Sequence, residues 1–131
     1  MTPDAETRVV EEIDRRWIAA FNAADIDTVV SLYTDDVVVM PPAEPSLHGR
    51  EAVRRWLGAF FEHHTAHQSL INDEVVVTGD WAWMRGHFTL VIERRDAPGE
   101  IRHEGKHLVI WRRQEGGSWM AARDIWNLDA P

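Results

Sequence analysis

The sequence predicts an α+β fold with a mostly antiparallel sheet, because helical and strand-like patterns fall in separate parts of the chain. Helical periodicity occupies the first half, whereas alternating apolar residues dominate after His67. Turn-forming residues at 96–99 and 115–118 separate the later strands as hairpin loops do. No repeat, low-complexity tract or linker interrupts this order, so we expect one domain over residues 1–131.

The first helix is indicated by Thr2 and Pro3, which suit an N-cap and a first helical turn. Apolar residues then recur at helical spacing, with charges between them: Val10, Ile13, Trp17, Ala20 and Phe21. The pattern breaks at 22–25, and a short second helix follows over about 26–33. Gly49 opens a third helix, whose apolar face consists of Val53, Trp56, Leu57 and Phe60.

The strands are expected at 37–40, 69–78, 81–94, 101–113 and 118–127. The first ends at Pro41 and Pro42, which cannot donate ladder hydrogen bonds. Both alternate faces of 81–92 are apolar: one carries Met84, Phe88 and Leu90, the other Trp81, Trp83 and Val91. Because the helices can cover only one face, the other is expected to meet a second subunit. The alternative to a second subunit is that the strands bend, so that side chains no longer alternate regularly between the two faces.

Composition limits the classes of protein and partner. Twenty-two acidic and 14 basic residues give a net charge of −8, which repels nucleic-acid phosphates. No apolar run approaches the roughly 20 residues that span a bilayer. The acidic first residues lack an apolar signal core, so a cytoplasmic location is expected. The absence of cysteine excludes disulfides, thiolate catalysis and thiolate metal sites.

Three segments carry a family resemblance: FNAADIDTVVSLYTDDVVVMPP, HGREAVRRWL and KHLVIWRRQEGGSWMAARDIWN. Over about residues 8–127 the chain resembles the nuclear transport factor 2-like superfamily, in its SnoaL-like polyketide cyclase and ketosteroid isomerase-related branch. The resemblance implies a cone-shaped, curved sheet that wraps around three N-terminal helices and leaves an apolar cavity. It also implies a homodimer formed through the convex face of the sheet.

The family register implies which side chains point into the cone. The ligand-binding candidates are Trp17, Phe21, Pro41, Trp56, Phe60, Trp83, Thr89, Leu108, Ile110 and Trp126. The catalytic candidates are Asp124, His87, Arg85 and Lys106. Composition alone favours the opposite face of 81–92, with Met84, Phe88 and Leu90 inside. The family register is preferred because a dimer would account for an apolar outer face.

The resemblance also argues against the chemistry of the ketosteroid isomerases. Those enzymes use an aspartate base, with a tyrosine and a protonated aspartate holding the oxyanion. In this sequence the base position falls on Pro41, the tyrosine position on Trp17 and the protonated-aspartate position on Lys106. We therefore do not expect that mechanism, although the indole N–H of Trp17 can still donate one hydrogen bond.

The four catalytic candidates have plausible roles and simpler alternatives. Asp124 in an apolar cavity would have a raised pKa and could act as base or acid, whereas His87 titrates near neutral pH unaided. Arg85 or Lys106 could stabilise a developing oxyanion. Alternatively, Arg85 and Asp124 form a bracing ion pair, His87 merely lines the cone, and Lys106 bends toward solvent.

The histidines do not predict a metal site. His63, His64 and His67 lie where a helix ends, and a C-terminal turn that complements the helix dipole accounts for them. His103 and His107 share a strand face but lie roughly 13 Å apart at strand rise, too far to bind one ion. No motif requires a cofactor.

Two hypotheses for the function follow. The first is a pocket that binds a small apolar molecule, with isomerase, cyclase or dehydratase chemistry on a polyketide- or steroid-like compound. The second is a non-catalytic dimerisation or association module whose cone is filled by aromatic side chains. An open cavity that reaches Asp124 would favour the first hypothesis.

Overall fold

The computed structural model describes residues 3–130 and has the predicted α+β architecture. Its elements are α1 (Pro3–Asn22), α2 (Ile26–Ser31), β1 (Tyr33–Met40), β2 (Leu47–His48), α3 (Arg50–His63), β3 (His64–Thr78), β4 (Trp81–Arg94), β5 (Glu100–Arg113) and β6 (Trp119–Leu128). The strands form one sheet in the order β2-β1-β6-β5-β4-β3. Only β1 and β6 pair in parallel, so the sheet is mixed and mostly antiparallel.

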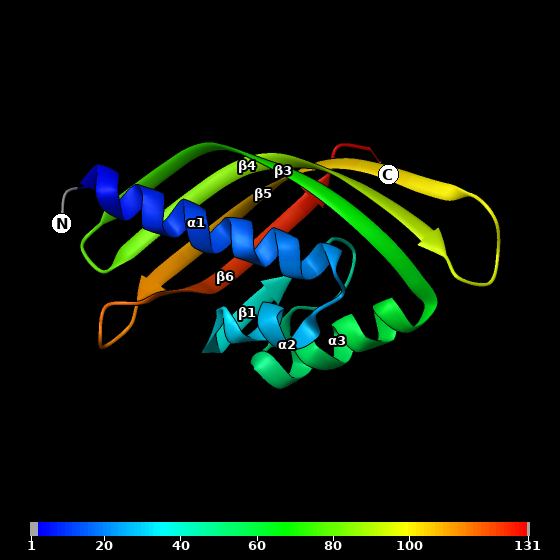
Figure 1. Ribbon diagram of the computed structural model, residues 1–131, viewed down its shortest axis with the longest axis horizontal. Coiled ribbons are helices and arrows are strands. Elements are labelled where there is room, and N and C mark those ends of the chain that lie inside the picture. The colour runs from blue at the N-terminus through cyan, green and yellow to red at the C-terminus, as the bar shows by residue number, and fades with distance from the viewer. Residues whose placement is uncertain (1–2, 131) are drawn as a thin grey trace.

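The sheet curves over the helices, as Figure 1 shows. Helix α1 runs across the concave side of the long strands, and α2 and α3 lie beside the short strand β1 (Figure 1). The arrangement is the expected α+β cone, with a concave face toward the helices and a convex face away from them. Within residues 3–130, no helix has the length and apolar character needed to cross a membrane.

Local sequence signals set the helix boundaries. Asp25 caps α2, because its side chain accepts a hydrogen bond from the backbone N–H of Thr28. Gly49 precedes α3 with a φ of 87°, a conformation that glycine adopts without strain. The proposed N-cap residue Thr2 lies outside the described residues. Tyr33 begins β1 rather than ending a helix, so the second helix is shorter than expected.

The register of the sheet corrects one expectation. Asp124 pairs with Val109, and Val109 pairs with Met84, so these three side chains share the concave face. Leu108 pairs with Ile125 on the opposite face. Because successive side chains alternate, this pairing turns the even-numbered residues of β4 and the odd-numbered residues of β5 inward. The composition-based interpretation of β4 is therefore confirmed, and the family-based orientation of β4 and β5 is wrong.

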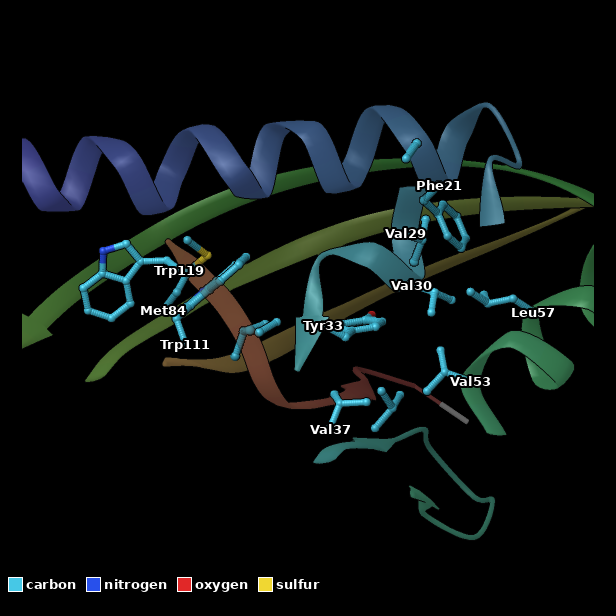
Figure 2. Packing of buried hydrophobic residues seen from close by; sticks show 14 of the residues in the cluster. Phe21, Val29, Val30, Tyr33, Val37, Val53, Leu57, Met84, Trp111 and Trp119 are labelled. Carbon is cyan, nitrogen blue, oxygen red and sulfur yellow. The ribbon is translucent and has the colours of Figure 1, made fainter. Parts of the chain in front are cut away.

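The hydrophobic core lies between the concave face and the helices. Met84, Trp111 and Trp119 form one end of it, apart from Val53 and Leu57 of α3 (Figure 2). Trp111 and Met84 are almost completely buried, so they fix the end of the cone near the start of β6. The remaining volume between these two groups is not filled, and it forms the site described next.

Candidate functional site

A cavity of about 280 Å³ opens between α1, α3 and the concave face of the sheet. Its walls are mostly apolar and include five aromatic side chains from α1, α3 and β6: Trp17, Phe21, Trp56, Phe60 and Trp126. The Trp17 and Phe21 rings stack with 5.5 Å between centroids, and the Trp56 and Trp126 rings are tilted at 6.0 Å. These paired rings make rigid apolar walls, which suit flat or cyclic ligands.

Asp124 is a buried acid in this cavity. It projects from the central strand β6 and is 8% exposed. The hydroxyl of Tyr33 donates a hydrogen bond to its Oδ2, at 3.3 Å. Burial raises the pKa of Asp124 from 3.8 to about 7, the negative charge of Asp14 adds to the rise, and the Tyr33 hydrogen bond opposes it. Near neutral pH both the protonated and the ionised carboxyl are therefore present.

Trp17 and Tyr33 form a short hydrogen-bonded chain that ends at Asp124. The indole Nε1–H of Trp17 donates to the Tyr33 hydroxyl at 2.9 Å, which leaves the hydroxyl hydrogen for Asp124. Burial beside Asp124 raises the pKa of Tyr33 well above 10.0, so this residue stays neutral. Trp17 thus reaches the cavity as expected, but its N–H holds Tyr33 rather than a ligand.

A second hydrogen-bonded chain joins α1 to β5 through β3. The side-chain amide of Asn72 donates from Nδ2 to Asp14 Oδ2 at 2.9 Å, and its Oδ1 accepts from His107 Nε2 at 3.3 Å. His107 is buried and neutral, because burial lowers its pKa from 6.5. Burial raises the pKa of Asp14, while the Asn72 hydrogen bond and the nearby Arg15 charge lower it.

The structure brings together seven of the predicted side chains. The residues that line the cavity are Trp17, Phe21, Pro41, Trp56, Phe60, Asp124 and Trp126. The others lie on the convex face, away from the cavity: Trp83, Arg85, His87, Thr89, Lys106, Leu108 and Ile110. The reason is the register described above, since a shift of one residue moves every side chain of a strand to the other face.

Two ion pairs and one histidine–carboxylate contact on the convex face account for three of these residues. Arg85 contacts Glu74 at 2.6 Å, His87 contacts Asp73 at 2.8 Å, and Lys106 contacts Asp129 at 3.0 Å. The alternative that Arg85 braces Asp124 is therefore wrong. All three pairs are largely solvent-exposed, so each contributes little to stability.

Six polar residues of the cavity were not among the predicted site residues: Asp14, Tyr33, Glu44, Gln68, His103 and His107. Asp14 carried a usable signal, because it lies on the same helical stripe as Val10, Trp17 and Phe21, where a charge is out of place. Tyr33 was assigned to a helix, and His107 to the convex face. In the described part of the chain, no group of three acidic or histidine side chains could hold a metal ion.

Comparison with known proteins identifies the family. Residues 15–122 match the SnoaL-like domain, and the chain belongs to this family. The fold places it in the nuclear transport factor 2-like superfamily, in the SnoaL-like branch. No curated protein matches the chain.

Several solved structures share the fold over nearly their whole length. A ketosteroid isomerase-like protein from Erwinia carotovora atroseptica is 29% identical, with a TM-score of 0.89 over 96% of this chain and 98% of the other. A conserved protein from Planctomyces limnophilus is 24% identical, with a TM-score of 0.87 over 95% and 98%. An NTF2-like protein with a cystatin-like fold from Novosphingobium aromaticivorans is 21% identical, with a TM-score of 0.80 over 97% and 85%.

Proposed function

We propose that the cavity binds a small, largely apolar ring compound bearing a carbonyl group, and that Asp124 transfers a proton to or from it. The observation that carries this proposal is a carboxyl inside an apolar cavity with a pKa of about 7. A group whose pKa lies near the working pH is the most effective general acid or base. The isomerase-like relative at 29% identity supports proton-transfer chemistry of this kind.

The mechanism differs from that of the ketosteroid isomerases. Pro41 lies in the cavity wall where those enzymes keep their base, so it supplies no carboxylate. Lys106 points to the convex face and is paired with Asp129. Asp124 is held by the neutral Tyr33 hydroxyl instead, and no ion pair forms with it among residues 3–130. Proton transfer therefore depends on the burial of Asp124, and ligand binding depends on the aromatic walls.

An open volume supports a ligand-binding role over an association module. The cavity of about 280 Å³ lies near the lower end of the range for small-molecule pockets, roughly 300–1,000 Å³. That volume suits a compound of one or two rings better than a four-ring one. Asp124 lines the cavity, so a ligand that enters it meets the carboxyl.

The test uses 2-tetralone, a two-ring ketone with an acidic C–H beside its carbonyl. Proton NMR in D2O would follow exchange of that hydrogen for deuterium. We expect the wild type to accelerate exchange and Asp124→Asn to lose roughly 10²–10⁴-fold of that acceleration. Asp129→Asn removes an exposed carboxyl outside the cavity and is the control. Equal exchange by the wild type and Asp124→Asn would contradict the proposal.

We also propose that the protein is a homodimer through the convex face. Large apolar side chains are exposed there: Ile71, Val76, Trp81, Leu108 and Ile125. The charged residues beside them are paired within the chain, as Arg85 is with Glu74, so the patch carries little net charge. A second copy fits such a surface, because an apolar patch without net charge does not repel itself.

A further inference from the structure

Asp14 is a second buried acid in the same cavity as Asp124. The two side chains are 7% and 8% exposed, and they project from α1 and β6 into one volume. Each accepts one hydrogen bond through Oδ2 from a neutral donor, Asn72 for Asp14 and Tyr33 for Asp124. Neither forms an ion pair with any residue from 3 to 130. Two unpaired carboxyls in an apolar cavity need an explanation, because burial makes each charge costly.

Repulsion between the two acids, rather than their hydrogen bonds, favours opposite protonation states, because the Asn72 and Tyr33 hydrogen bonds each lower the pKa of the acid that accepts them. Asn72 uses its Oδ1 to accept from His107 and so presents only N–H hydrogens to Asp14. An N–H donor suits an ionised carboxylate, which only accepts. A negative charge on Asp14 in turn raises the pKa of Asp124. The cavity therefore favours the Asp14 carboxylate together with the Asp124 carboxylic acid, which share one proton.

We propose that Asp14 is a second catalytic residue, whose carboxylate removes a proton from carbon while the Asp124 carboxyl protonates a leaving hydroxyl. The cavity would then eliminate water from a ring carbonyl compound with a hydroxyl group on the carbon β to the carbonyl. This inference rests on the proposed function and adds to it the second residue and the class of substrate.

The step balances with these two residues alone. The C–H bond beside the carbonyl breaks, and its proton forms an O–H bond on Asp14. The released electron pair forms a C=C bond, the C–O bond breaks, and the departing hydroxyl takes the proton of Asp124 and leaves as water. After turnover Asp14 is protonated and Asp124 is ionised. Proton exchange with water restores the starting state.

Two of the surrounding groups add no charge beside this pair. Tyr33 stays neutral because of its raised pKa, and His107 stays neutral because of its lowered pKa. The titratable groups that act on the pair or on His107 are Glu11 and Arg15 on α1, Tyr33 on β1, Asp73 on β3 and His87 on β4. Besides the pair, the titratable residues that line the cavity are Tyr33, Glu44, His103 and His107, and the exposed Glu44 accepts a hydrogen bond from the indole N–H of Trp56.

The experiment uses 3-hydroxy-1-tetralone, which loses water and rearranges to fluorescent 1-naphthol. The matched variants are Asp14→Asn, which keeps the size and can still accept from Asn72, and Glu11→Gln, which removes one charge from α1 outside the cavity wall. Rates are measured between pH 5 and pH 9, and carbon-13 NMR gives the pKa of Asp124 in each protein. Circular dichroism checks that each variant is folded.

We expect Asp14→Asn to form 1-naphthol at least about 100-fold more slowly, with binding of 2-tetralone unchanged. Glu11→Gln should stay within about threefold of the wild type. The wild-type rate should decline above about pH 7 as Asp124 loses its proton, and Asp14→Asn should lower the pKa of Asp124.

Two results would overturn the inference. One is an Asp14→Asn rate within about threefold of the wild type; the other is an unchanged pKa of Asp124 in that variant. A wild type that exchanges 2-tetralone through Asp124 but forms no 1-naphthol would overturn this inference and leave the proposed function standing. A wild type that acts on neither ketone would overturn both.

Discussion

At the scale of single residues, burial of Asp124 links the site to the stability of the protein. Its pKa of about 7 compares with 3.8 for an exposed carboxyl, so between these values the folded protein holds a proton that the unfolded chain has released. The stabilising contribution of this group is therefore complete below about pH 4 and is lost as the pH rises through 7. At about 1.36 kcal/mol per pH unit, the loss is on the order of 4 kcal/mol.

His107 contributes to stability in the opposite sense. Burial lowers its pKa from 6.5, so the stability that it provides is present above that value and is lost as the pH falls. The two effects favour a protein that is most stable in mildly acidic solution, where Asp124 is protonated and His107 is still neutral. Ionisation of Asp124 near neutral pH thus lowers the stability of the folded protein, as expected of a functional group.

At the scale of elements, a bulge in β3 follows the residue that joins the second chain of hydrogen bonds. Asn72 points inward in the same alternation as Leu70, and the pairing of β3 with β4 then shifts between Asn72 and Glu74. Asp73 and Glu74 therefore both lie on the convex side, where they contact His87 and Arg85. Gly86 lies opposite the bulge, and a Cβ on it would be 2.0 Å from the Ile71 carbonyl oxygen. The close approach of the two strands therefore requires glycine at this position.

We predict that Gly86→Ala destabilises the protein by about 1–3 kcal/mol, because the new methyl group meets backbone rather than a movable side chain. Gly58→Ala is the matched control: nothing lies within 4 Å of its Cβ position on α3, so it should stabilise by about 0.5–1 kcal/mol. Urea unfolding measures both. Equal stabilities of the two variants would contradict this account of the bulge.

The elements also show how far the sequence could be interpreted. Helical periodicity and turn residues located the three helices and the four long strands, with β3 starting earlier than expected. The orientation of β4 and β5 could not be resolved, because both faces of β4 are apolar and alternation alone does not choose between them. Extra residues at Asp73 of β3 and Ala122 of β6, which have no partner on the adjacent strand, further change the alternation within those strands. Asp124 was predicted because the family register assigned its side of β6 correctly.

At the scale of the whole molecule, the curved sheet gives the protein two distinct surfaces. The concave face contains the cavity and the two buried acids, whereas the convex face carries exposed apolar side chains next to paired charged ones, as Leu108 lies beside Arg85. The resemblance of three sequence segments to the family predicted this cone, because the order of helices and strands fixes how the sheet can wrap. It did not predict Asp14, Tyr33 or His107 in the cavity, which come from three different elements.

We predict that Leu108→Glu on the convex face converts the proposed dimer to a monomer. Leu108 is 38% exposed and pairs with Ile125 on the central strands, so a charge there would be buried in the interface without a partner. Ile101→Glu is the control, since Ile101 is 53% exposed on the same strand but belongs to the concave-facing set. Analytical ultracentrifugation distinguishes the two states. A wild type that is monomeric, or a dimeric Leu108→Glu, would contradict the dimer.

The pKa of Asp124 tests the central claim most directly, because both the cavity and its chemistry depend on a carboxyl removed from water. Carbon-13 NMR of labelled aspartate carboxyls across pH 3 to 9 measures it, and Asp124→Asn identifies the signal by its loss. The account predicts a midpoint of about 7. A midpoint near 4, the value of a carboxyl in free contact with water, would contradict it.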